Sequence, residues 1–112
     1  MDFAKVQRRL REFANERDWE QYHSPKNLSM ALSVEAAELV EHFQWLTESQ
    51  SSSPGALDTN ELANEIADVQ IYLVMLADKL GVNIDLAVER KIAANALKYP
   101  PPPHDSNESN SP

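Results

Sequence analysis

The sequence predicts an all-α fold, a four-helix bundle that oligomerises through its helices, and three observations support this prediction. The chain has only 2 Gly in 112 residues. Most of its 7 Pro lie near the C-terminus, so the turn signals of a β fold are scarce. Apolar residues recur at helical spacing in separate segments, and 42% hydrophobic residues suffice for the core of one domain.

The first two helices are expected over residues 3–17 and 25–48. A short polar loop separates them. Ser24 followed by Pro25 is typical of an N-cap with proline at the first helical position. The apolar residues of the first helix that share one face are Phe3, Val6, Leu10 and Phe13.

The third helix is expected over residues 59–80, after a polar loop at 49–58 that contains Pro-Gly. Asp58 and Glu61 have the spacing of a capping box. Gly81 is a suitable residue to end the helix, because glycine adopts the left-handed conformation without steric cost.

The fourth helix is expected over residues 84–98, with Asn83 as its N-cap. Four consecutive prolines then prevent any continuation of the helix. Residues 101–112 are rich in Pro, Ser and Asn and have almost nothing to bury, so they are predicted to be a disordered tail. The domain itself is predicted to be residues 1–100.

Charge and composition exclude several classes of protein. The net charge of −8 argues against a binder of polymeric nucleic acid, which needs a basic surface. The absence of Cys excludes a disulfide scaffold and Cys-ligated zinc. No apolar run approaches the roughly 18 residues of a membrane span, and the N-terminus has no signal peptide pattern. We therefore expect a cytoplasmic protein that does not bind membranes.

Two glutamates of the second helix lie where its apolar face should be. Glu35 and Glu38 fall inside or at the edge of the stripe, and His42 joins them, whereas Glu41 points roughly 120° away from Glu35. The stripe itself consists of Leu28, Ala31, Leu32, Leu39, Phe43 and Leu46. His42 is more often a structural histidine in such a position than a functional one.

The third helix repeats this arrangement, because Glu61, Glu65, Asp68 and Tyr72 line one shoulder of its apolar stripe. If the two helices pack antiparallel, the ExxE pair faces the ExxD pair. Like charges are costly to bury unless something neutralises them. Mg²⁺ prefers oxygen ligands and keeps waters that phosphates can replace. A single ExxE is usually a solvated face, but two such pairs favour a metal site.

Three segments carry a resemblance to a known family: FANERDWEQYHSPKNLSMALSVEAAELVEHFQW, ELANEIADVQIYLVMLADKLGV and KIAANALKYP. They resemble the MazG-like all-α nucleoside triphosphate pyrophosphohydrolases, and within that superfamily the dCTP pyrophosphatases. The resemblance implies Mg²⁺-dependent hydrolysis, with Mn²⁺ as a substitute, of dCTP or modified dCTP between the α and β phosphates. The products would be the nucleoside monophosphate and pyrophosphate, and the role would be cleansing of the nucleotide pool. It also implies a homodimer or homotetramer.

The resemblance further implies roles for particular residues. The metal ligands would be Glu35, Glu38, Glu65 and Asp68. Glu38 would also orient or deprotonate the attacking water. The phosphate contacts would be Lys91, Asn95, Lys98 and Tyr99. The base-binding residues would be Trp19, His23, Trp45 and Tyr72. The spacing of the lysines places them on one helix face, but lysines near a helix C-terminus are also favourable without any ligand.

Two alternatives stay open from the sequence. The first is a non-catalytic helical interaction module, in which the inward carboxylates determine register. The second is a pyrophosphatase of broader specificity that accepts dATP or dUTP. The aromatic residues leave a similar choice, because Trp19 and Trp45 could close the ends of the core instead of stacking a base.

Overall fold

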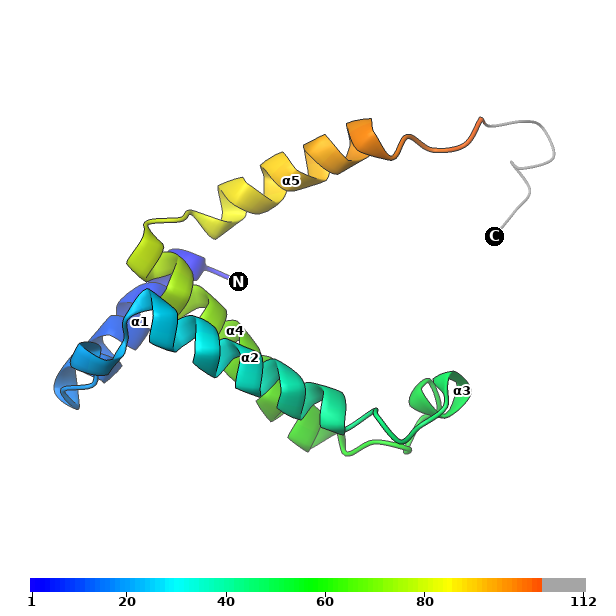
Figure 1. Ribbon diagram of the computed structural model, residues 1–112, viewed down its shortest axis with the longest axis horizontal. Helices are drawn as coiled ribbons and strands as arrows, with labels where there is room; N and C mark the ends of the chain where they lie inside the picture. Colours follow the sequence, from blue (N-terminus) through cyan, green and yellow to red (C-terminus); the bar gives the residue numbers. More distant parts are fainter. Residues whose placement is uncertain (104–112) are drawn as a thin grey trace. The chain divides into compact units, whose positions relative to one another are not determined.

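The computed structural model describes residues 1–103, and this part of the chain contains helices and no strand, which confirms the all-α prediction (Figure 1). The chain divides into two compact units, residues 1–82 and a second unit that begins at Asn83. The elements in order are α1 (Phe3–Glu16), the 3₁₀ turn η1 (Glu20–Tyr22), α2 (Pro25–Glu41), α3 (Glu48–Ser51), α4 (Thr59–Leu80) and α5 (Ile84–Lys98). No helix within residues 1–103 is both long and apolar enough to cross a membrane.

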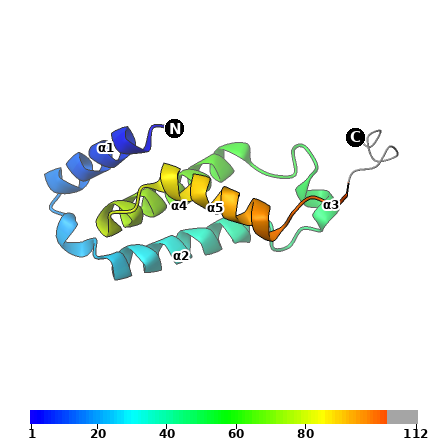
Figure 2. The same cartoon turned by 90° about the horizontal axis from the view of Figure 1, so that it is seen from above.

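The first unit is built on the pairing of α2 with α4, which run side by side in opposite directions (Figures 1 and 2). Helix α1 packs on α4. Within residues 1–103 the fully buried large side chains are Leu28 of α2 and Val74 of α4, and Ala14 of α1 and Ala77 of α4 are also buried. The predicted antiparallel arrangement of the two carboxylate-bearing helices is therefore present.

The predicted helix starts are confirmed by their caps. The Ser24 hydroxyl accepts from the backbone N–H of Asn27 at 3.1 Å, and Asn83 caps α5 in the same way. The Asp58 carboxylate accepts from the N–H groups at the start of α4. Gly81 ends α4 in the left-handed conformation with φ 69. These positions follow from local side-chain chemistry, which a sequence displays directly.

The predicted extent of the second helix is wrong. Helix α2 ends at Glu41 instead of residue 48, and turns follow it to α3. Thr47 is extended and forms a reciprocal capping box with Gln50, which starts a new helix. Because an N-cap residue has non-helical backbone angles, the helix cannot pass through Thr47. Part of the loop predicted at 49–58 therefore belongs to α3.

Two ion pairs hold α1 and η1 against α4. The Arg11 guanidinium binds the Asp78 carboxylate with two nitrogens, one of them Nε at 2.6 Å. The hydrogen bond from Arg11 and its positive charge hold the pKa of Asp78 below its usual value, although partial burial opposes them. Lys79 lies 3.9 Å from the Glu20 carboxylate. These contacts fix the place of α1, whose packing on α4 is less extensive than that of α2.

The second unit consists of α5 and the residues after it. Helix α5 covers the predicted 84–98 and has no buried residue. An isolated helix of 15 residues is only marginally stable in water. Residues 101–103 have no regular secondary structure, and the rest of the predicted tail, residues 104–112, lies outside the described residues. The predicted domain boundary at residue 100 stays a prediction.

Candidate functional site

A group of three carboxylates lies between α2 and α4. Glu35, Glu38 and Glu65 each offer an oxygen, and these oxygens all lie within 4.8 Å of one another. Glu35 and Glu38 are one turn apart on α2, so they project from the same face, and Glu65 meets them from α4. All three side chains are partly buried.

The electrostatics of this group favour a cation. The pKa of Glu35 is raised to about 7, first because burial disfavours its charged form and then because of Glu38, Asp68 and Glu65 beside it. The Oε2 atoms of Glu35 and Glu65 are buried and have no hydrogen-bond partner. An unpartnered buried carboxylate oxygen is costly. An all-oxygen donor set of this kind fits a hard divalent ion such as Mg²⁺.

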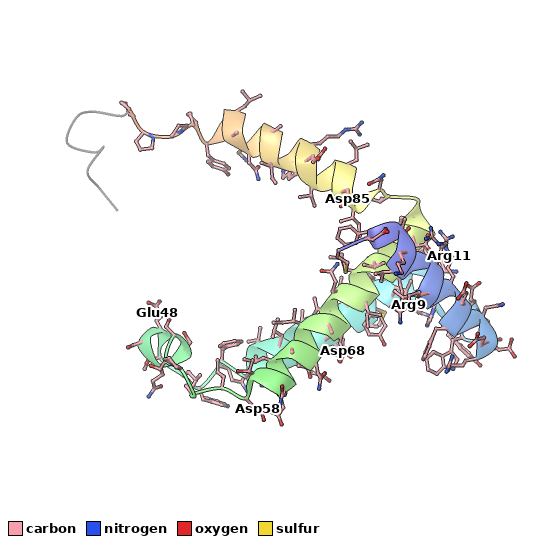
Figure 3. All side chains as sticks on the ribbon, turned by 180° about the vertical axis from the view of Figure 1, so that it is seen from behind. Arg9, Arg11, Glu48, Asp58, Asp68 and Asp85 are labelled. Carbon is pink, nitrogen blue, oxygen red and sulfur yellow. The ribbon has the colours of Figure 1, made fainter. Side chains whose placement is uncertain are left out.

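The other acidic residues near this group have different positions. Asp68, the fourth predicted ligand, is exposed and outside the group of three, although its charge still acts on Glu35. Figure 3 shows Asp68 midway along α4, between the Asp58 cap and α1. Glu41 and Glu61 are also exposed and outside the group. The structure thus separates the inward pair of α2 from Glu41, as the helical spacing predicted.

A cavity of about 360 Å³ lies beside Asp68, between α4, α1 and the segment that follows α1. Ligand pockets in proteins start at about 300 Å³. Three of the four predicted base-binding residues, Trp19, His23 and Tyr72, line this cavity. The remaining lining residues are Leu10, Phe13, Ala14, Asp68, Ile71 and Met75. An aromatic and aliphatic wall with a few polar groups can hold a flat heterocycle.

The other predicted site residues lie after α2 and in the second unit. Trp45 follows α2 and is 86% exposed. The four predicted phosphate contacts lie in the second unit, where the Lys98 ammonium sits 5.3 Å above the Tyr99 ring. All four are exposed: Lys91, Asn95, Lys98 and Tyr99. Their roles stay predictions.

Sequence analysis missed two features of the cavity wall. Phe13 was assigned only to the apolar face of α1, but its ring packs edge-on against Trp19 with 5.5 Å between centroids. The Arg17 guanidinium lies 3.5 Å from the centre of the same ring. Asp18, which stands between Arg17 and Trp19 in the chain, has a positive φ of 55. The enrichment of Asp in left-handed positions is a weak signal that could have indicated this turn.

Acidic side chains from two antiparallel helices, next to an aromatic cavity, define an all-α protein with a candidate divalent-metal site. Comparison with known families agrees with this class. The model of the MazG-like family matches residues 30–111. The chain belongs to the MazG-like family.

Individual relatives are similar over most of this chain. The proteins named dCTP pyrophosphatase 1 from Homo sapiens and Mus musculus are each 44% identical to it, over 85% of this chain. The chain spans 57% of the length of these relatives. The crystal structure of a pyrophosphatase from Archaeoglobus fulgidus DSM 4304 superposes with a TM-score of 0.83 at 42% identity, covering 90% of this chain and 94% of that one.

Proposed function

We propose that this protein is a metal-dependent nucleoside triphosphate pyrophosphohydrolase that acts on dCTP or a modified dCTP. The observation that carries the proposal is the group of Glu35, Glu38 and Glu65. One oxygen of Glu35 and one of Glu65 are buried without a hydrogen-bond partner. A cavity of suitable size for a base lies beside Asp68 of the same helix as Glu65. The printed names of its relatives, dCTP pyrophosphatase 1 and pyrophosphatase, support the same reaction. The products would be the deoxynucleoside monophosphate and pyrophosphate, and the place of action the cytoplasm.

The proposed ligands for Mg²⁺, or for Mn²⁺ in its place, are Glu35, Glu38, Glu65 and Asp68. When bound, the ion supplies positive charge for the triphosphate oxygens. Glu38 orients the attacking water and accepts its proton. The water oxygen forms a bond to the α-phosphorus, the bond from that phosphorus to the bridging oxygen breaks, and pyrophosphate leaves with the electron pair.

The base would occupy the cavity, where the rings of Trp19 and Tyr72 offer stacking surfaces and His23 offers a hydrogen-bonding edge. Asp68 lines the same cavity. A base held there would leave its phosphates near the carboxylates of α2 and α4. Trp45 is proposed to contribute a further aromatic surface, although it does not line this cavity within a single chain.

The proposed phosphate contacts are three residues of α5 and the residue that follows it: Lys91, Asn95, Lys98 and Tyr99. The lysine ammonium groups can donate to phosphate oxygens. Residues 1–100 would form the catalytic domain. The tail at 101–112 has no proposed role.

A homodimer or homotetramer is proposed because large apolar side chains are exposed on several helices. Examples are Met30 at 57%, Ile66 at 56% and Ile92 at 64% exposed. Sedimentation at micromolar protein is expected to give two or four times the chain mass of 12.6 kDa. Ile92→Asp is expected to shift this mass downward, whereas Glu89→Gln on the same helix leaves it unchanged. A wild-type monomer would contradict the proposal.

The reaction is tested by measuring pyrophosphate release from each of the eight common NTPs and dNTPs, with and without Mg²⁺. Metal-dependent release that is fastest from dCTP is the expected result. Faster release from dATP or dUTP would keep the reaction and change the specificity, because one functional group on a base is worth only a few kcal/mol of discrimination. If no triphosphate yields pyrophosphate at micromolar protein, the enzyme proposal fails, and the carboxylates would then belong to a non-catalytic helical interaction module.

A further inference from the structure

We propose that Asp18 is a positioning residue for the nucleobase, because its left-handed backbone conformation turns Trp19 toward the cavity. The inference rests on the proposed function. It concerns a residue that does not itself line the cavity. The effect passes through the neighbouring Trp19, which does.

The geometry at the end of α1 is that of a Schellman motif. The N–H of Trp19 donates to the carbonyl of Ala14 at 2.9 Å, and the N–H of Asp18 donates to the carbonyl of Asn15 at 3.3 Å. This pair of bonds reverses the chain direction after the helix and requires the residue that follows the C-cap to be left-handed. Asp18, with φ 55, occupies that position, and within residues 1–103 it is the only residue other than glycine with positive φ.

The apolar contact that accompanies such a motif is the one that builds the cavity wall. A Schellman motif commonly pairs the residue after the left-handed position with one in the last turns of the helix. Here that pair is Trp19 and Phe13, packed edge to face at 67°. The Arg17 guanidinium covers the Phe13 ring and its Nη1 donates to the Phe13 carbonyl at 3.0 Å. The turn, the arginine and the two rings therefore form one unit.

The segment after the turn is also tied to Asp18. The side-chain amide of Gln21 donates to the carbonyl oxygen of Asp18 at 3.0 Å. Next, η1 leads to His23, which lines the cavity, while Lys79 of α4 lies close to Glu20. A different backbone conformation at Asp18 would displace Trp19, whose side chain is 45% exposed and so has room to move.

Substitutions at position 18 separate the backbone conformation from the carboxylate. Gly and Asn adopt the left-handed conformation readily, whereas a β-branched residue there is a genuine outlier. Asp18→Gly and Asp18→Asn are therefore expected to keep the wild-type KM for dCTP. Asp18→Val is expected to raise KM about tenfold with kcat within twofold, since a base–aromatic stack of typical strength is lost.

Glu12→Val is the matched control, because Glu12 is an exposed acidic residue inside α1. It is expected to leave KM unchanged. If Asp18→Val does not fold, as judged by circular dichroism, Asp18→Ala has a smaller backbone penalty and is expected to raise KM in the same direction by less. A glycine variant as impaired as the valine variant would overturn the inference, as would a valine variant with wild-type KM.

A second readout does not depend on catalysis. The chain has 2 Trp, so in a Trp45→Phe background the fluorescence reports on Trp19 alone. Asp18→Val is expected to shift its emission to the red and increase its quenching by acrylamide, while Asp18→Gly keeps both. If the wild-type protein hydrolyses no triphosphate, the proposed function fails, and the fluorescence comparison still decides whether Asp18 positions Trp19.

Discussion

Glu38→Gln is expected to reduce pyrophosphate release from the preferred triphosphate by at least about a hundredfold. Glu38 is both a proposed metal ligand and the proposed acceptor of the water proton, and its carboxylate lies within 4.8 Å of those of Glu35 and Glu65. Charge stabilisation by a metal is worth several kcal/mol in such a transition state. Each ~1.4 kcal/mol corresponds to a factor of ten in rate.

The matched control for this variant is Glu41→Gln, which changes an exposed carboxylate at the end of the same helix. It is expected to keep the wild-type rate within about twofold, as surface substitutions usually have small effects. Circular dichroism establishes that both variants stay helical. Equal activity of the Glu38 variant and wild type would remove Glu38 from the proposed site and would count against the enzyme itself.

Glu35→Gln is expected to raise the melting temperature of the metal-free protein by several degrees at pH 8, and to abolish its stabilisation by Mg²⁺. The Glu35 carboxylate is partly buried among like charges and has one oxygen without a partner. Its replacement by a neutral amide removes this repulsion. A ligand that binds only the folded state stabilises it by mass action, so loss of the ligand set removes that gain.

The pH dependence of the metal-free protein has the same origin. The pKa of Glu35 is about 7 in the folded state, against an ordinary value of 4.5, so between these values the folded state binds more protons than the unfolded state. The free energy of unfolding of the metal-free protein therefore falls as the pH rises from 4.5 to 7. Glu35→Gln is expected to remove this slope, and below pH 4.5 it should differ little from wild type.

Thermal melts at several pH values, with and without Mg²⁺, measure both effects, and Glu41→Gln again serves as the control. A Glu35 variant that melts lower than wild type at pH 8 without metal would show that the carboxylates do not repel one another. Undiminished stabilisation of that variant by Mg²⁺ would place the metal elsewhere.

The helix starts and the inward glutamates could be predicted because both follow from local properties. Ser24 and Asp58 cap their helices through side-chain oxygens a few atoms from the N–H groups they accept. The three-residue spacing of Glu35 and Glu38 places them on one face of any α-helix. Helix α2 was predicted too long, because its apolar stripe continues through Phe43 and Leu46 while the Thr47 capping box ends any continuous helix.

By itself, the sequence determined the all-α class and the two carboxylate pairs, since helical periodicity and motif spacing act within one segment, and the resemblance of three segments indicated the family. Only the tertiary structure decided which residues meet. It brings Glu65 to Glu35 and Glu38, leaves Asp68 facing the cavity and leaves Trp45 exposed. These outcomes depend on how α1, α2 and α4 pack, and packing is a balance of contacts between residues far apart in the chain, which no local pattern contains.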